Sequence, residues 1–159
     1  MRKYTILIIL FATFLLNGCH QPNVSEEGGR MELSGSKPPD VYIHVGHEIY
    51  DTILGTYCWG SECVETADPV EMLSDEKPII VKAGEMVTIE MDFQPLPNKV
   101  YLEHFRNNTA FHMTMNDHTF QAPEEKGIYY YSYGVSWMDE KIEKLTHGDA
   151  FYSFALEVK

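Results

Sequence analysis

Basic side chains are scarce in this chain of 159 residues, which has 12 Lys and Arg against 24 Asp and Glu. Arg2 and Lys3 are the only charged residues before position 19, so residues 19–159 carry 10 basic and 24 acidic side chains, a net charge of −14. A protein this acidic repels the phosphate backbone of nucleic acids. We therefore expect no nucleic-acid partner.

The chain also lacks the sequence signatures of the common enzyme classes. It contains no GxSxG nucleophile turn and no glycine-rich phosphate loop. It also has no lone cysteine accompanied by a histidine in the pattern of a cysteine nucleophile. We therefore predict no catalytic residues, with a small envelope enzyme accessory as the alternative from another functional class.

No apolar run in the N-terminal region is long enough to cross a membrane. The run Tyr4–Leu16 has 13 residues and as a helix would extend about 20 Å, whereas the hydrocarbon core is about 30 Å thick. Because Arg2 and Lys3 precede it, the run is typical of the apolar core of a signal peptide. We predict a signal peptide over residues 1–18.

The tetrapeptide Leu16-Asn17-Gly18-Cys19 follows this run and resembles the lipobox of bacterial lipoproteins. The resemblance implies cleavage after Gly18 and a diacylglycerol thioether on Cys19, the mature N-terminus. Two or more acyl chains, at about 0.8 kcal/mol per buried methylene, would hold the protein stably on the membrane. We therefore expect a lipid anchor on the extracytoplasmic side of the cell membrane. The alternative is an uncleaved N-terminal anchor with an incidental cysteine.

Residues 20–39 have few apolar side chains and many Gly, Ser, Pro and Glu. This composition is typical of disordered segments. Together with Cys19 they are predicted to form a lipidated flexible tether over residues 19–39, with an r.m.s. reach of roughly 25 Å. One folded domain is then expected over residues 40–159.

From Val41 onward the apolar residues alternate with a period of two, as in strands that have one buried face. Val41–Val45, Met86–Phe93 and Ala150–Val158 show this pattern most clearly. Further candidate strands are Thr52–Cys58, Pro78–Lys82, Val100–Phe105, Phe111–Met115, His118–Ala122 and Ile128–Trp137. Only Pro69–Asp75 suggests a helix. Many short strands separated by turns predict an all-β fold, a single antiparallel β-sandwich.

One predicted hairpin can be specified in register. If Asn116-Asp117 is a two-residue turn, Met113 lies opposite Phe120. Both side chains would then point inward, together with Phe111 and Ala122. The side chains predicted to point to solvent are His112, Thr114, Thr119 and Gln121.

Cys58 and Cys63 remain as a pair once Cys19 carries the lipid. The four residues between them, Trp59–Glu62, suit a hairpin loop that would bring the two thiols opposite each other. We predict a structural disulfide worth about 2 kcal/mol, which would fix the loop and the exposure of Trp59. The alternative is a redox or metal-binding pair, but the spacing is not CxxC.

Histidines raise the question of a metal site in two places, the string His44–Glu48 (HVGHE) and the segment His112–His118 with its two methionines. The period of two argues against both, because adjacent residues such as His112 and Met113 point to opposite faces of a sheet. The HxxHE order also differs from the HExxH motif of zinc hydrolases. We predict no metal site and no cofactor.

The segments Lys82–Ile89 (KAGEMVTI) and Phe120–Tyr131 (FQAPEEKGIYYY) resemble strands of small extracytoplasmic β-sandwiches of the immunoglobulin-like and cupredoxin-like kinds. The resemblance implies an immunoglobulin-like sandwich, and the tyrosine after Gly127 suits a tyrosine corner. A cupredoxin would imply bound copper and electron transfer. No cysteine follows Cys63 to ligate blue copper, so a degenerate cupredoxin-like metal handler is the remaining alternative.

Over most of residues 50–159 the chain resembles uncharacterised lipoproteins of Bacillus-like Gram-positive bacteria. The matching segments are Gly55–Trp59 (GTYCW) leading to Cys63, Gly127–Trp137 (GIYYYSYGVSW) and Gly148-Asp149-Ala150. This resemblance implies a lipoprotein but no particular activity.

An aromatic stripe is predicted on one face of the late strand, formed by Tyr129, Tyr131, Tyr133 and Trp137. Such a stripe is typical of a core. If part of it is exposed together with Trp59, these five residues would instead form a patch that binds a protein or a sugar. The sequence thus predicts a lipid-anchored binding or interaction module at the cell envelope, whose partner is an envelope protein or glycan.

Overall fold

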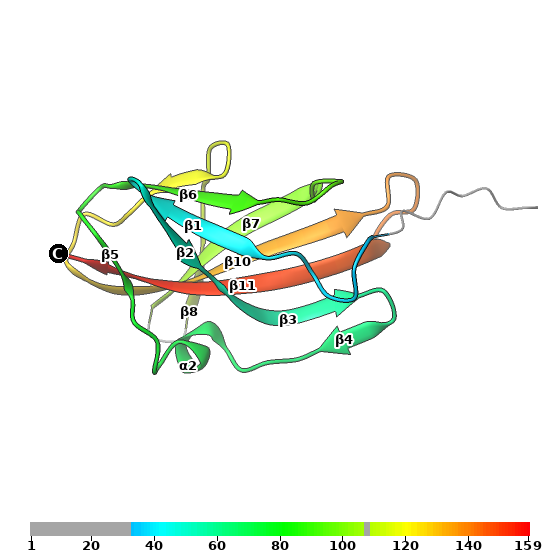
Figure 1. Cartoon of the computed structure of the whole chain (residues 1–159), viewed down its shortest axis with the longest axis horizontal. Helices are drawn as coiled ribbons and strands as arrows, with labels where there is room; N and C mark the ends of the chain where they lie inside the picture. The colour runs from blue at the N-terminus through cyan, green and yellow to red at the C-terminus, as the bar shows by residue number, and fades with distance from the viewer. Residues whose placement is uncertain (1–32, 107–108) are drawn as a thin grey trace, which may run out of the picture.

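The computed structural model describes residues 33–106 and 109–159, which form two β-sheets packed face to face and one short helix (Figure 1). The predicted signal peptide, Cys19 and residues 20–32 of the tether lie outside the described residues. Within the described part, no helix has the length and apolar character needed to cross a membrane.

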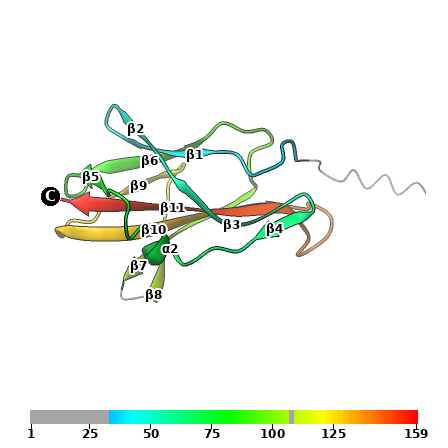
Figure 2. The same cartoon turned by 60° about the horizontal axis from the view of Figure 1, so that its bottom comes forward.

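The two sheets differ in size. The smaller has the strand order β2 (Glu48–Asp51), β1 (Val41–Val45), β6 (Met86–Met91) and β9 (Thr119–Gln121). The larger has the order β4 (Glu62–Val64), β3 (Ile53–Trp59), β11 (Thr146–Val158), β10 (Gly127–Met138), β7 (Lys99–Arg106) and β8 (Thr109–Met113). A short strand, β5 (Ile79–Val81), pairs in parallel with the end of β11, and the other pairs are antiparallel. Helix α2 (Pro69–Met72) lies on the outer side of the larger sheet (Figure 2).

Part of the strand arrangement matches that of an immunoglobulin-like sandwich, although β3 and β4 extend the larger sheet beyond β11. Strands β7, β10 and β11 lie side by side as the C, F and G strands do in that fold, and β6 pairs with β9 as B pairs with E. The predicted tyrosine corner is also present, because the Tyr129 hydroxyl donates a hydrogen bond to the carbonyl oxygen of Glu125 at 2.9 Å. The predicted all-β antiparallel sandwich is therefore confirmed.

The period-two pattern places the expected side chains in the core. On β1, β6 and β11 the inward residues are the predicted apolar ones, and all of the following are buried: Val41, Ile43, Val45, Val87, Ile89, Tyr152, Phe154, Leu156 and Val158. Strands β2 and β4 were not predicted because they are short and mostly polar. The helix is shorter than predicted, since it ends at Met72 instead of Asp75.

The predicted hairpin has the wrong register. The central turn residues are Asp117 and His118, both with positive φ, and Asn116 pairs with Thr119. Beyond that single bridge the two strands separate, because β8 pairs with β7 in the larger sheet and β9 with β6 in the smaller. Phe111 is consequently 45% exposed instead of buried, whereas Phe120 is buried as predicted.

The folded domain extends further toward the N-terminus than residue 40. Residues 33–39 have no regular secondary structure, but Leu33 packs against the core. The indole Nε1 of Trp59 donates to the carbonyl oxygen of Gly35 at 3.1 Å, and the Tyr152 hydroxyl donates to that of Pro39 at 2.6 Å. These residues, predicted as tether, therefore belong to the domain because they supply acceptors to two buried donors.

Three tyrosines of the core make the fold sensitive to alkali. Burial raises the pKa of Tyr133 from 10.0 to about 12, and burial raises the pKa of Tyr131 and Tyr152 further. The folded state thus favours the neutral phenols. This contribution to stability is fully present below pH 10 and is lost as the pH rises through the folded-state pKa values of the three tyrosines. For Tyr133 alone the difference corresponds to roughly 3 kcal/mol.

We therefore expect cooperative unfolding as the pH rises toward 12. In a titration followed by tyrosinate absorbance, the exposed tyrosines should ionise first and reversibly. The buried ones should ionise only together with the loss of near-ultraviolet circular dichroism. Ionisation of all tyrosines in one step near pH 10, with the dichroism intact, would contradict this expectation.

The hydroxyl group of Tyr131 has no hydrogen-bond partner among the described residues, although it is fully buried. Its ring stacks on Phe154, with 5.0 Å between centroids, so Tyr131→Phe keeps the packing and removes only the unpaired polar group. We expect this variant to be more stable to urea by about 1 kcal/mol. Tyr152→Phe is the matched control, because it loses the bond to Pro39 and should be less stable by a similar amount.

Candidate functional site: a groove on the outer face of the larger sheet

The predicted aromatic binding patch is not exposed. Trp59, Tyr131, Tyr133 and Trp137 are all buried, and Tyr129 is half-buried with its hydroxyl used in the tyrosine corner. The reason is that the inward face of β10 packs against the smaller sheet. The interpretation of the stripe as core is thus confirmed, and its alternative as a binding patch is wrong.

Trp59 lies on the inward side of its strand next to a disulfide that lies on the outward side. Cys58 and Cys63 are bonded to each other, which confirms the predicted pairing. Trp59 pairs directly with Glu62, so the loop has only two residues, Gly60 and Ser61. Because neighbours on a strand alternate in direction, the disulfide cannot expose Trp59. Instead, the ring packs edge-on against Trp137, with 5.0 Å between centroids.

A row of polar side chains crosses the opposite, outer face of the larger sheet. Ser153 on β11 lies beside Ser132 on β10, which lies beside Glu103 on β7, which lies beside His112 on β8. The two serines are only 2% and 4% exposed, respectively. Serines on the outer face of a sheet are ordinarily exposed to water, so something must cover them.

The cover is α2 together with the segment that leads into it. They enclose a groove of about 400 Å³ against the sheet. Its walls combine apolar side chains with the buried hydroxyl groups and two carboxylates. The lining residues are Gly55, Thr56, Thr66, Ala67, Asp68, Pro69, Met72, Glu103, Phe105, Ser132, Phe151 and Ser153.

Local sequence holds this cover in place. The Asp68 carboxylate accepts hydrogen bonds from the N–H groups of Val70 and Glu71 at 2.9 and 3.1 Å, and Pro69 occupies the first turn, where no N–H is needed. The cover passes close to β3 at Gly55, where a Cβ would lie 3.3 Å from the carbonyl oxygen of Phe151 and 3.4 Å from Thr66 Oγ1. The backbone N–H of Thr66 donates to Thr56 Oγ1 at 3.1 Å.

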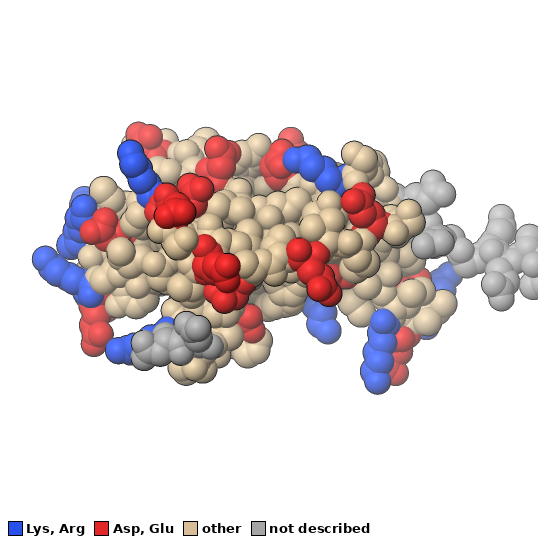
Figure 3. Space-filling model, turned by 90° about the horizontal axis from the view of Figure 1, so that it is seen from below, with Lys and Arg blue, Asp and Glu red and all other residues tan. Residues whose placement is uncertain are grey.

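The charge of the groove is negative. Asp68 and Glu103 line it, and no Lys or Arg does so among the residues that the structure describes. Within the described part of the chain, Glu103 forms an ion pair only with the exposed His112, whose Nδ1 lies 3.4 Å away. The side of the molecule that carries α2 also shows acidic side chains across its middle (Figure 3). A ligand of this groove should therefore be neutral or positively charged.

The polar row does not have the order needed for nucleophilic catalysis. A serine nucleophile requires a base within hydrogen-bond reach, held in turn by an acid. Here Glu103 lies between Ser132 and His112 in the strand order, so the histidine is not next to a serine.

The histidines singled out in the sequence lie in separate places. His44 pairs with Glu90 at 2.7 Å, His112 with Glu103, and His118 Nδ1 lies 3.1 Å from the hydroxyl of Tyr133. Over residues 33–106 and 109–159, no three His, Cys, Asp or Glu side chains come close enough to hold a metal ion.

Comparison with protein-family models, curated proteins and solved structures found no match to this chain. The functional inference therefore depends on the chemistry of the groove. Sequence reasoning missed this site because it is formed by a distant segment folding over β3. A signal was present, however, since Ser132 and Gly134 place small residues at outward positions of an otherwise bulky strand.

Proposed function

We propose that this protein is a lipoprotein anchored to the outer side of the cell membrane through Cys19, and that its domain binds an envelope protein or glycan in the groove beneath α2. The lipobox-like sequence supports the anchor. The binding role rests on one observation, the two buried serines on the floor of a partly apolar groove. Its volume of about 400 Å³ lies within the usual range for ligand sites, about 300–1,000 Å³.

The groove lining favours a ligand with an apolar body and a few neutral or cationic polar groups. Phe105, Phe151 and Met72 offer apolar and aromatic surface, while Ser132 and Ser153 can exchange hydrogen bonds with hydroxyl or amide groups. A cationic group would be attracted to Glu103. An anionic ligand would have to overcome the repulsion of two carboxylates and of the acidic domain as a whole.

Filling the groove tests this role. Ser153→Tyr places a large side chain on the floor of the groove. In crosslinking on intact cells that produce the lipidated protein, we expect this variant to lose the partners that the parent protein captures. The matched control is Thr88→Tyr, at a half-buried position of β6, on the outer face of the smaller sheet. This control should keep the partners.

Both variants must first be shown to melt within a few degrees of the parent protein. The proposal fails if correctly folded Ser153→Tyr and Thr88→Tyr capture the same partners in the same yield as the parent. Loss of the partners in both variants would also argue against the groove, because it would indicate an effect that is not local to α2.

A further inference from the structure

The loop between β10 and β11 presents two large apolar side chains to solvent. Ile142 is 58% exposed and Leu145 is 40% exposed. Lys141 and Lys144 lie next to them in the sequence. Single exposed apolar residues are common in proteins, but here two stand in one short loop whose other residues are all charged, namely Asp139, Glu140, Lys141, Glu143 and Lys144. We call residues 139–145 the apolar loop after these two side chains.

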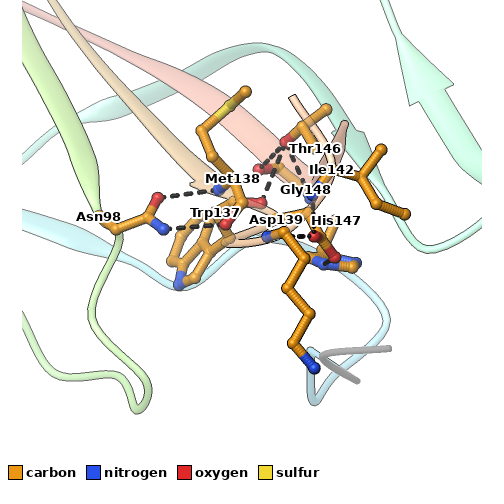
Figure 4. A network of polar contacts seen from close by, with 9 residues as sticks. Asn98, Trp137, Met138, Asp139, Ile142, Thr146, His147 and Gly148 are labelled. Carbon is orange, nitrogen blue, oxygen red and sulfur yellow. Dashed lines mark hydrogen bonds and ion pairs between the residues drawn. The ribbon is translucent and has the colours of Figure 1, made fainter. Parts of the chain in front are cut away.

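This loop is held rigidly by hydrogen bonds (Figure 4). The Asp139 carboxylate accepts bonds from the N–H groups of Lys141 and Ile142 at 2.8 and 2.7 Å, and it lies 2.9 Å from Nε2 of the buried His147. The two N–H groups hold the pKa of Asp139 below its usual value. The Asp139 N–H donates to the carbonyl oxygen of Leu145 at 2.8 Å. The fold therefore fixes the two apolar side chains in an outward position.

The base of the loop is also tied to the neighbouring strand. The side chain of Asn98 pairs with both the N–H and the carbonyl oxygen of Met138, each at 2.8 Å. At the other side of the loop, the single hydroxyl hydrogen of Thr146 is within reach of two carbonyl oxygens, that of Gly148 at 2.9 Å and that of Trp137 at 3.3 Å. These bonds brace both ends of the apolar loop.

The N-terminal end of the described chain lies at the same end of the sandwich as this loop. A Cβ at Gly148 would lie only 2.5 Å from Leu33 Cδ1, so Leu33 sits directly on the start of β11. The C-terminus and β5 lie at the opposite end (Figure 1). Residues 20–32 separate Leu33 from the predicted lipid on Cys19, and a segment of that length spans at most about 45 Å in any conformation.

We propose that the apolar loop contacts the membrane surface, with Ile142 and Leu145 in the boundary between headgroups and acyl chains. This inference rests on the lipid anchor of the proposed function. The anchor keeps the loop at high effective concentration near the lipid, so even a weak contact is occupied. Apolar burial carries this contact, because the domain is acidic and the loop itself has three acidic side chains, Asp139, Glu140 and Glu143, against two lysines, so anionic lipids contribute no net attraction. The end that carries the apolar loop thus faces the membrane.

A fluorescent label on the full-length lipidated protein tests this orientation. Ile142→Cys is labelled with an environment-sensitive dye, and the protein is reconstituted into vesicles of phosphatidylcholine and phosphatidylglycerol, with or without nitroxide-bearing lipids. The matched control is Ile80→Cys on β5, a position that is 57% exposed and lies at the opposite end of the sandwich. We expect a blue-shifted emission and quenching by lipid nitroxides for the label at 142, and neither for the label at 80.

The outcomes separate this inference from the anchor itself. If the protein floats with the vesicles but the label at 142 behaves like the label at 80, the membrane contact is wrong and the anchor stands. If the protein does not float with the vesicles, the anchor fails, and the orientation fails with it. A blue shift at 142 without quenching by lipid would place the loop against protein, such as a second copy, and would also overturn the proposal.

Discussion

Cys19→Ser is expected to abolish lipid attachment completely. The thioether of a lipoprotein forms on a cysteine sulfur, which is a far better nucleophile than a serine hydroxyl group, and we propose that cleavage after Gly18 requires this lipid. The variant should therefore lose all incorporation of a labelled fatty acid. It should also keep residues 1–18, which its mass would show.

The two other cysteines provide the control for this experiment. A Cys58→Ser/Cys63→Ser protein lacks the disulfide but keeps Cys19, so it should incorporate the labelled fatty acid as the parent does. If the parent protein incorporates no fatty acid and keeps residues 1–18, the alternative of an uncleaved N-terminal anchor is correct. Equal labelling of the parent and of Cys19→Ser would contradict the assignment of the lipid to this residue.

The strands could be predicted from the sequence because the information for them is local. A period of two over five or more residues identifies a half-buried strand without knowledge of its partner, as in β1 and β6. The direction of Trp59 was equally accessible, since an outward Cys58 requires an inward Trp59 on the same strand. Predicting an exposed Trp59 treated the residues of a tight hairpin as an open loop.

The features that could not be predicted depend on distant parts of the chain. Asn116-Asp117 and Asp117-His118 are both acceptable turn pairs. The turn lies at Asp117-His118, between β8 and β9, which join different sheets. Residues 33–39 have the composition of a tether, but Trp59 and Tyr152 need their carbonyl oxygens as acceptors. The groove exists only because the segment around Thr66 returns across Gly55.

Trp137→Ala is expected to lower the free energy of unfolding by about 3–5 kcal/mol. The indole is fully buried and packs edge-on against Trp59 and Phe93, at centroid distances of 5.0 and 5.6 Å. Its Nε1 donates to the carbonyl oxygen of Pro95 at 2.7 Å, so truncation leaves a large cavity and an acceptor without its donor. Since the total stability of a domain is about 5–15 kcal/mol, this one change removes a large part of it.

Urea unfolding followed by tryptophan fluorescence and near-ultraviolet circular dichroism measures this loss. Ile142→Ala is the matched control, because it truncates an exposed apolar side chain at the same end of the sandwich and should change stability by less than about 0.5 kcal/mol. Trp137→Phe should fall between them, since it keeps an aromatic ring beside Trp59 but loses the bond to Pro95. If Trp137→Ala unfolds at the same urea concentration as Ile142→Ala, the packing of Trp137 against Trp59 and Phe93 is not what stabilises this end of the domain.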